Sequence, residues 1–400
     1  MNVYYYKQLG ANNTTDNQPS PSRGLSVDLD EVVQQSTSMQ DSGAKHEVVE
    51  DKEKNILFFG FNQLNSLFAV GTEQGFYVYS TQNLKERTKM LFNGGIGIVE
   101  MLFKSNIFAL VGGGPRPAFN PDRVILWEDS QKKCISEILT GNKPIKAVKL
   151  QKNLLVVVLE DQVIVYDHDI KERGRDHTTE NPNGLVAISP DTEHIVLAYP
   201  SVQIGMVAVN HLSSFPEQKV HILAHNSKIA QIALNRDGTR LATASEKGTL
   251  IRVFDTKSKE MVKEVRRGSK QARIYSIAFS DDSNFLACSS DTGTIHVFSL
   301  VEKTHNRTSS FSFVGGYIAN IFNSEWSFGE YRGGEDGLAN IPTLVSFAPR
   351  KAEDDQTVSV NVLTARGEII TLTFDVSGAQ QTSPTSVQKR SFLANNSNNE

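Results

Sequence analysis

Short apolar stretches with an alternating pattern recur along the chain, each about the length of one β-strand. The repetitive middle of the chain carries no helical periodicity, so the pattern predicts an all-β protein. The apolar stretches are Phe76–Tyr79, Val124–Trp127, Val163–Tyr166, Met206–Val209, Ile251–Phe254, Ile295–Phe298 and Ile370–Phe374. The first six are spaced by about 40 to 48 residues, which is typical of four-stranded propeller blades.

Glycine turns precede several of these stretches and support the same prediction. They are Glu73-Gln74-Gly75, Glu246-Lys247-Gly248, Asp291-Thr292-Gly293 and Arg366-Gly367. Each suits a tight hairpin between the two middle strands of a blade. Together the units predict a seven-bladed WD40-type β-propeller over residues 55–376, with the most complete blade at residues 221–256.

The two ends of the chain lack this pattern. Residues 1–54 and 377–400 are rich in Asn, Gln, Ser and Thr and contain few large apolar residues. Such segments bury too little apolar surface to offset the entropy of ordering, so we expect disordered N- and C-terminal arms. The step to the last blade is much longer than the others, which predicts an insertion over residues 301–325 in blade six.

Composition limits the classes of function. The net charge of −4 gives no bulk attraction to nucleic acid or to an anionic membrane, so any anion binding must be local. The sequence also lacks a basic stripe with interleaved aromatic residues, which is the pattern expected of a nucleic-acid-binding protein. No apolar run approaches the roughly 20 residues of a membrane-spanning helix, and the polar N-terminus lacks the apolar core of a signal peptide. We therefore expect a cytoplasmic protein.

The residue pattern gives no indication of an enzyme or of a cofactor. Cys134 and Cys288 are far apart and have no metal-ligand spacing, which argues against a structural zinc and suits a reducing compartment. No carboxylate pair or nucleophile-base set emerges from the sequence. Gly112-Gly113-Gly114 does not open a helix, as a phosphate-binding loop must. We expect no catalytic residues, no metal and no cofactor.

The clearest local charge is a basic stretch between blades five and six. Residues 252–273 contain Arg252, Lys257, Lys259, Lys263, Arg266, Arg267, Lys270 and Arg273 against three acidic residues. Alone, such a stretch is typical of a solvated sheet edge, where charges discourage strand pairing. Arg266 and Arg267 are adjacent, however, and neighbouring side chains of an extended strand point to opposite faces. The pair is predicted to send one guanidinium into each of two anion sites.

The sequence around this pair resembles the PROPPIN family, β-propellers that bind polyphosphoinositides. The run Val265-Arg266-Arg267-Gly268 follows Ser245, Thr249 and Arg252 in the spacing of the family signature. The family usually has Phe or Leu where this chain has Val265, a conservative change that leaves the arginines in place.

Other segments extend the resemblance over residues 55–375. Residues 109–117 (ALVGGGPRP) and 124–129 (VILWED) are similar to the second blade of one branch of the family, the animal WIPI proteins closest to lipid-transfer machinery. Residues 323–328 (NSEWSF) are similar to the start of the family's seventh blade.

The resemblance implies two lipid pockets. The first would use His225, Ser245, Thr249, Arg252 and Arg266. The second would use Arg267, Ser276, Ser290, Thr294 and His296. Guanidinium groups with hydroxyls and imidazoles are what an inositol phosphate head group requires. His225 also has an alternative role, because many WD repeats use a histidine to tie the strands of a blade together.

The expected insertion begins polar and basic and then becomes apolar. In the family this connection enters the bilayer, and aromatic residues partition well into the membrane interface. We therefore predict that Phe311 and Phe313 insert into the membrane, whereas Ile318, Ile321 and Phe322 pack against protein.

The resemblance implies a peripheral membrane adaptor for phosphatidylinositol 3-phosphate and the 3,5-bisphosphate, acting in autophagosome formation and endosomal traffic. We expect a monomer at phagophore and endosomal or vacuolar membranes. The expected partner is an autophagy lipid-transfer protein near blades one to three, although Leu64 stands where an acidic residue is expected after Asn62-Gln63. The alternative is a WD-repeat scaffold that binds only protein, with the basic stretch as a peptide dock.

Overall fold

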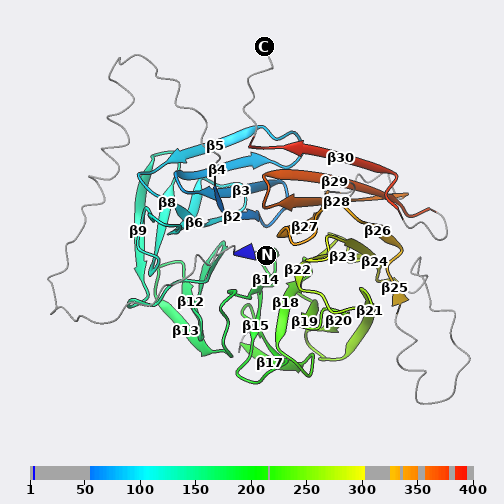
Figure 1. Ribbon diagram of the computed structural model, residues 1–400. Coiled ribbons are helices and arrows are strands. Elements are labelled where there is room, and N and C mark those ends of the chain that lie inside the picture. The colour runs from blue at the N-terminus through cyan, green and yellow to red at the C-terminus, as the bar shows by residue number, and fades with distance from the viewer. Residues whose placement is uncertain are drawn as a thin grey trace, which may run out of the picture.

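The computed structural model describes residues 3–4, 55–214, 217–301, 325–333, 337–349, 356–377 and 383–393. Within these ranges seven sheets stand around a common axis, and in each sheet the strands follow one another from the centre outwards (Figure 1). None of the described residues is helical. The predicted all-β, seven-bladed propeller is confirmed.

Blades one to three each take four successive antiparallel strands. Blade one has β2 (Ile56–Phe61), β3 (Leu67–Thr72), β4 (Gly75–Ser80) and β5 (Glu86–Leu91). Blade two has β6 (Ile96–Met101), β7 (Ile107–Gly112), β8 (Arg123–Glu128) and β9 (Lys133–Leu139). Blade three has β10 (Ala147–Gln151), β11 (Leu154–Val158), β12 (Gln162–Asp167) and β13 (Glu172–His177).

Blades four to seven repeat this order. Blade four has β14 (Ala187–Ile188), β15 (Val196–Pro200), β16 (Met206–His211) and β17 (Gln218–Leu223). Blade five has β18 (Ile229–Leu234), β19 (Arg240–Ser245), β20 (Leu250–Asp255) and β21 (Met261–Arg266). Blade six has β22 (Ile274–Phe279), β23 (Phe285–Ser290), β24 (Ile295–Ser299) and β26 (Gly329–Tyr331). Blade seven has β27 (Thr343–Phe347), β28 (Thr357–Thr364), β29 (Glu368–Asp375) and β30 (Ser386–Ser391).

The seven apolar stretches found in the sequence are the third strands of the seven blades. These strands are apolar because neighbouring blades pack face to face and cover both sides of each sheet. Between blades one and two, for example, the Phe92 ring meets Trp127 edge to face, with centroids 5.4 Å apart. The outer strands have a neighbour on one edge only, and β13 is accordingly almost wholly exposed.

The turn between β19 and β20 places backbone close to the connection from blade five to blade six. Gly248 has a φ of 59°, and a Cβ there would lie 1.8 Å from the carbonyl oxygen of Ala272. Only glycine permits this approach. The predicted glycine turns are thus present, and this one lies beside the arginine pair.

The C-terminal tail differs from the expected disordered arm. Strand β30 lies within residues 377–400 and pairs with β29 from Glu368–Ser391 to Thr373–Ser386. Just beyond it, Phe392 is buried with its ring 5.0 Å from that of Phe68 in blade one. The tail therefore completes blade seven and packs against blade one. Its polar sequence gave no apolar signal because the outer strand of a blade is mostly solvated.

The N-terminal end also contributes one short strand. β1 (Val3–Tyr4) pairs antiparallel with β2, which places it on the inner edge of blade one. Two residues of the segment expected to be a disordered arm therefore belong to a sheet.

The insertion in blade six separates β24 from β26. After it, β25 (Glu325–Trp326) pairs in parallel with β21 of blade five, and Glu325 forms an ion pair with Lys263 at 2.9 Å. β26 then becomes the outer strand of blade six. The resemblance of residues 323–328 to the start of a seventh blade is therefore wrong for the described part of this segment, which joins blades five and six.

Candidate functional site

Arg266 and Arg267 lie where blade five ends. Arg266 is the last residue of β21 and is paired with Leu250 on one side and with Trp326 on the other. The backbone N–H of Arg267 donates to the Thr249 carbonyl at 2.9 Å, which extends the ladder by one step. Arg266 is half-buried, whereas Arg267 is only 6% exposed. The two neighbouring side chains therefore have different surroundings.

Backbone carbonyls hold the Arg267 guanidinium in place. Its Nε donates to the carbonyl of Gly248 at 2.9 Å, and its Nη2 donates to the carbonyl of Lys270. Burial raises the pKa of the Cys288 thiol in blade six to about 12, and the positive charge of Arg267 opposes that shift. The Arg267 guanidinium is thus close enough to Cys288 of blade six for its charge to affect that thiol. A guanidinium has five N–H donors, so donors remain for an anion.

His225, Thr243 and Arg252 lie together in blade five. His225 precedes β18, and its Nε2 lies 3.0 Å from Oγ1 of Thr243. Arg252 faces Thr243 across the β19–β20 pair, and its Nη1 donates to the Ala224 carbonyl at 2.7 Å. Burial lowers the pKa of His225 to about 4, with the charge of Arg252 as the second cause. His225 is therefore neutral at pH 7, and its contact with Thr243 joins the segment that precedes β18 to strand β19.

A carboxylate lies on the other side of Arg252. Glu264 pairs with Arg252 in the strand register, and its Oε2 accepts from Arg252 Nε at 2.9 Å. The two side chains are 29% and 23% exposed, so solvent screens this ion pair only in part. An anionic ligand that reaches Arg252 must compete with Glu264.

Ser245 and Thr249 flank the turn between β19 and β20. Ser245 ends β19 and is buried, while Thr249 is half-buried. Among the described residues, neither hydroxyl has a hydrogen bond to Arg252 or Arg266. All five residues predicted for the first pocket therefore lie at one end of blade five, although the hydroxyls and guanidinium groups are not joined to one another.

Blade six repeats the arrangement around Arg252 with a histidine. His296 pairs with Cys288 on one side and with Glu330 on the other. Its ring is 6% exposed, and its Nδ1 lies 3.0 Å from Oγ of Ser327, in the segment between β25 and β26. The insertion thus returns at the predicted second pocket and supplies a hydroxyl that fixes the imidazole.

Ser290 and Thr294 lie on the turn between β23 and β24. The Oγ of Ser290 lies 2.9 Å from Oγ1 of Thr292, which in turn donates to Thr294 at 3.4 Å. Ser276 has a different position. It is fully buried, and its Oγ accepts from the backbone N–H of Val345 in blade seven at 3.2 Å. Ser276 faces the joint between blades six and seven rather than the turn.

Four residues that contact the predicted site residues were missed in the sequence. They are Thr243, Glu264, Ser327 and Glu330. The alternation of side chains along a strand could have identified two of them. Thr243 lies two positions before Ser245, and Glu264 two positions before Arg266. No such signal existed for Ser327 and Glu330, because their place depends on where the insertion rejoins the propeller.

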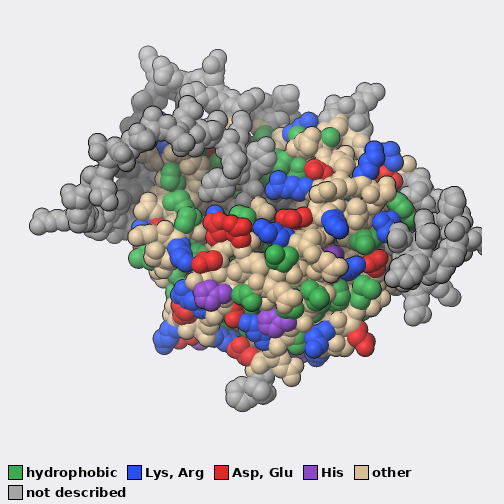
Figure 2. Space-filling view, turned by 60° about the horizontal axis from the view of Figure 1, so that its bottom comes forward, with side chains coloured by type: hydrophobic (Ala, Val, Ile, Leu, Met, Phe, Trp, Pro, Cys, Tyr) green, Lys and Arg blue, Asp and Glu red, His purple; other side chains and the backbone are tan. Residues whose placement is uncertain are grey.

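The surface charge is mixed over the side of the molecule that Figure 2 presents. Basic and acidic side chains alternate there, and no single basic field dominates. This agrees with the net charge of −4 and with an anion site that is local.

Phe311 and Phe313 lie outside the described residues, as do Ile318, Ile321 and Phe322. Over the part of the chain that is described, there is no helix long and apolar enough to cross a bilayer. In the same ranges no group of His, Cys, Asp or Glu side chains is arranged to hold a metal ion.

The fold and the site define a seven-bladed β-propeller with a divided arginine pair between blades five and six. The PROPPIN family model matches residues 55–329, and the chain belongs to this family.

Relatives and solved structures agree with this assignment. The chain is 37% identical over 283 residues to autophagy-related protein 18e of Arabidopsis thaliana. The aligned region covers 69% of this chain and 75% of the relative. The chain is 38% identical over 250 residues to SVP1-like protein 2 of Neurospora crassa, covering 61% of this chain but only 56% of that longer protein.

Two solved structures share the fold at lower identity. The Hsv2 structure of Kluyveromyces lactis with complete loop 6CD matches with a TM-score of 0.64 and 21% identity, over 84% of this chain and 98% of that one. KlAtg21 in complex with the coiled-coil of AgAtg16 matches with a TM-score of 0.62 and 24% identity, over 84% and 98%.

Proposed function

We propose that this protein is a peripheral membrane adaptor that binds phosphatidylinositol 3-phosphate and phosphatidylinositol 3,5-bisphosphate. The observation that carries the proposal is the division of the arginine pair. Arg266 ends the outer strand of blade five and is half-buried, while Arg267 is buried and its guanidinium is held by the carbonyls of Gly248 and Lys270 in the turn and the connection beside it. Membership of the PROPPIN family supports the lipid class.

The first pocket would bind a head group through Arg252 and Arg266. Both are half-buried, which strengthens a charge-assisted hydrogen bond to phosphate relative to a fully solvated arginine. Neutral His225 and the hydroxyls of Ser245 and Thr249 would complete the pocket as uncharged partners. Glu264 would oppose binding, because phosphate and carboxylate compete for the same guanidinium.

The second pocket would combine Arg267 and His296 with the hydroxyls of Ser290 and Thr294. Arg267 is held by two carbonyls and His296 by Ser327, so little side-chain entropy is lost when a ligand binds. Ser276 would act here by holding blade seven in place rather than by touching lipid.

The insertion in blade six would add membrane affinity through Phe311 and Phe313. The pairing of β25 with β21 supports this role, because it anchors the end of the insertion next to Arg266. The energy of burying phenylalanine in the acyl region does not depend on the head group.

Recruitment of proteins is the second part of the proposal. The names of the Arabidopsis and other relatives support a role in autophagosome formation, and we extend it to endosomal traffic. The expected partner is an autophagy lipid-transfer protein that docks near blades one to three. The solved complex of KlAtg21 with a coiled-coil supports the view that a propeller of this type can hold a protein partner. We place the protein in the cytoplasm as a monomer, attached to phagophore and endosomal or vacuolar membranes.

Liposome flotation with the full-length protein tests the lipid proposal. Vesicles with and without phosphatidylinositol 3-phosphate are compared for the wild type, Arg266→Thr with Arg267→Thr, and Phe311→Ser with Phe313→Ser. The arginine variant should lose most lipid-dependent flotation. The phenylalanine variant should float less while still binding soluble head group.

The matched control removes two positive charges elsewhere, with Arg116→Thr and Arg236→Thr in blades two and five. Both side chains are exposed and distant in sequence from the arginine pair. Equal flotation of the wild type and the folded Arg266/Arg267 variant would instead support the scaffold that binds only protein.

A further inference from the structure

Three exposed apolar side chains gather at one turn of blade four. Val202 and Ile204 lie in the turn between β15 and β16 and are 65% and 54% exposed. Leu223, the last residue of β17, is 56% exposed and pairs with Met206 at the start of β16. Single exposed apolar residues are common on protein surfaces, whereas a contiguous group of them marks a contact surface. We refer to these three side chains as the blade-four apolar patch.

The turn that carries the patch has a fixed backbone. The N–H of Met206 donates to the carbonyl of Gln203 at 3.1 Å, and the N–H of Ser201 donates to the carbonyl of Met206 at 2.9 Å. Gly205 has a φ of 77°, and a Cβ there would lie 1.8 Å from the carbonyl oxygen of His225. The apolar side chains are therefore presented to solvent on a rigid frame, so little conformational entropy is lost when they make a contact.

Hydrogen bonds connect this turn directly to the first proposed lipid pocket. The carbonyl of Gly205 accepts from the backbone N–H of Ala224 at 2.9 Å and from that of His225 at 3.0 Å. The carbonyl of Ala224 in turn accepts from Nη1 of Arg252 at 2.7 Å. The patch therefore lies beside His225 and Arg252, two of the residues expected to surround a lipid head group.

The turn also lies on the same face of the propeller as the proposed pockets. The strands of each blade are antiparallel and follow one another outwards, so the turns between second and third strands all lie on one face. The turns at Thr249 and Thr294 belong to this set, and blade four is the neighbour of blade five (Figure 1). A membrane that places a head group in the first pocket would therefore come close to the patch.

Blades four and five present different chemistry at equivalent positions. Leu223 pairs with the first residue of β16, just as Arg266 pairs with Leu250, the first residue of β20. Leu223 thus holds the place in blade four that Arg266 holds in blade five. The turns differ in the same way, since blade five has Glu246-Lys247-Gly248-Thr249 and blade four has the uncharged Val202-Gln203-Ile204-Gly205. Cationic and apolar groups side by side are typical of surfaces that lie in a membrane interface.

We propose that Val202, Ile204 and Leu223 enter the interfacial region of the membrane whose lipid head group occupies the first pocket. The inference rests on the proposed lipid binding and adds a contact in blade four that is separate from the insertion in blade six. A membrane fits better than a protein partner, because three side chains on one turn are far smaller than the roughly 1,200 Å² that a stable protein interface buries. Shallow entry into the interface requires only such a small apolar group next to cations.

Fluorescence of a label on the turn tests the proposal directly. Ile204→Cys is made in a full-length protein with Cys134→Ser and labelled with the environment-sensitive dye NBD, while Cys288 is buried and does not react. The labelled protein is mixed with phosphatidylcholine vesicles that contain or lack phosphatidylinositol 3-phosphate. The emission should rise severalfold and shift to the blue with the phosphoinositide vesicles only, because the dye leaves water as the turn enters the interface.

Flotation and calorimetry test whether the patch contributes to attachment. Val202→Ser with Ile204→Ser should weaken attachment to phosphoinositide vesicles about fivefold, because less apolar surface leaves water. The binding of soluble inositol 1,3-bisphosphate should be unchanged, which also shows that the variant is folded.

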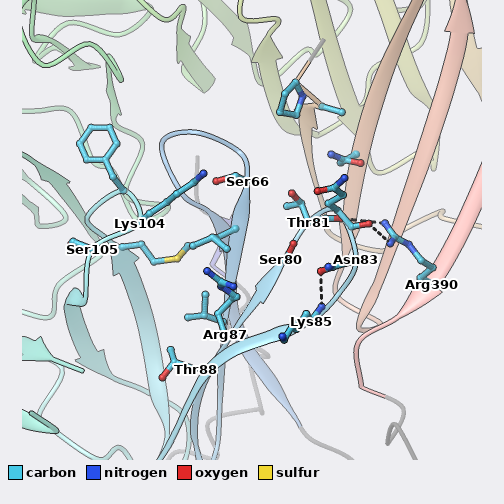
Figure 3. A pocket seen from close by; sticks show the side chains of 18 of the residues that line it. Ser66, Ser80, Thr81, Asn83, Lys85, Arg87, Thr88, Lys104, Ser105 and Arg390 are labelled. Atoms are coloured by element: carbon cyan, nitrogen blue, oxygen red, sulfur yellow. Dashed lines mark hydrogen bonds between the residues drawn. The ribbon is translucent and has the colours of Figure 1, made fainter. Parts of the chain in front are cut away.

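The matched control is Leu91→Ser with Leu139→Ser in blades one and two. Leu91 and Leu139 are 43% and 61% exposed, and each pairs with the first residue of a third strand, as Leu223 does. These blades lie on the other side of the ring from blade five (Figure 1). Neither leucine lines the polar pocket that Arg87 and Lys104 border between blades one and two (Figure 3). The control should float as the wild type does.

The outcomes separate this inference from the proposed lipid binding. If the wild type floats but the NBD signal does not change, the patch stays in water and only this inference is wrong. If the wild type does not float on phosphoinositide vesicles, both fail. An equal loss of attachment in the control would show nonspecific apolar adhesion and would overturn the role of blade four. A wild type that light scattering shows to be a dimer, and that becomes a monomer in the Val202/Ile204 variant, would assign the patch to a second copy of the chain instead.

Discussion

Arg266 and Arg267 are adjacent in sequence, yet their side chains have different surroundings. Arg266 remains in the β21 ladder between Leu250 and Trp326, whereas Arg267 turns inward and is held by the carbonyls of Gly248 and Lys270. At the residue scale, the affinity of each proposed pocket for a phosphate group depends on the groups that already bind its arginine side chains.

Glu264 should limit the affinity of the first pocket. Replacing it by Gln removes the carboxylate that pairs with Arg252, so phosphate no longer has to displace it. We expect Glu264→Gln to raise the affinity for soluble head group roughly threefold, in line with about 0.7 kcal/mol for a partly exposed ion pair. Calorimetry measures this change directly.

Glu260→Gln is the matched control, because Glu260 is exposed and has the same charge on the same stretch. It should leave the affinity close to that of the wild type. A gain as large as that of Glu264→Gln would show that only the net charge of the stretch matters.

His225 should make the propeller sensitive to acid. Burial lowers its pKa from about 6.5 in the unfolded chain to about 4 in the folded protein, so the unfolded chain binds the proton first as the pH falls. Its contribution, up to about 3 kcal/mol, is complete above pH 6.5 and is lost as the pH falls toward 4.

His225→Gln should therefore lower the free energy of unfolding at pH 7 but reduce its further fall between pH 6.5 and 4.5. The midpoints of urea denaturation at pH 7, 6.5 and 4.5 measure both effects. His168→Gln, at an exposed histidine, should retain the pH dependence of the wild type. If His225→Gln also loses stability as steeply as the wild type, the buried neutral imidazole is not the source.

Part of the site could be predicted from the sequence because its residues follow a repeat. Ser245 and Ser290 each precede a glycine turn, and Arg252 and His296 occupy the same place in successive third strands. The hydrogen bonds that hold these residues could not be predicted in the same way. They join segments far apart in the chain, such as His296 with Ser327.

At the scale of elements, apolar inner strands could be predicted and polar outer strands could not. β30 reads as a polar tail because one side of it faces solvent, and β26 lies after an insertion that breaks the repeat. Both strands are fixed by pairing with an inner strand already in place. Local sequence pattern contains no information about such a partner.

The C-terminal strand should matter for stability. Phe392 is buried, with its ring 5.0 Å from Phe68 and 5.8 Å from Tyr79 in blade one. Phe392→Ala should lower the free energy of unfolding by about 3 kcal/mol, because it leaves a cavity between blades seven and one. Urea denaturation measures the change.

Val387→Ala in the same strand is the control, since Val387 is 45% exposed. It should cost less than about 0.5 kcal/mol. A Phe392→Ala protein as stable as the wild type would mean that the tail does not close the ring.

At the scale of the whole molecule, the sequence repeat predicts the architecture because each blade buries its inner strands against its neighbours. This packing between neighbouring blades also holds the two proposed lipid pockets side by side on blades five and six. Two weak contacts held at fixed separation reinforce each other through effective concentration. Attachment should therefore rise more steeply than linearly with the density of phosphoinositide in the membrane.

The central claim is that the divided arginine pair serves two separate pockets, and titration calorimetry with soluble inositol 1,3-bisphosphate tests it most directly. The wild type should bind about two equivalents, because each pocket has its own arginine-centred anion site. Arg252→Ala and His296→Ala should each bind about one, since each change removes a cationic or imidazole partner from one pocket only. A single equivalent in the wild type, or two equivalents retained in both folded variants, would contradict the account.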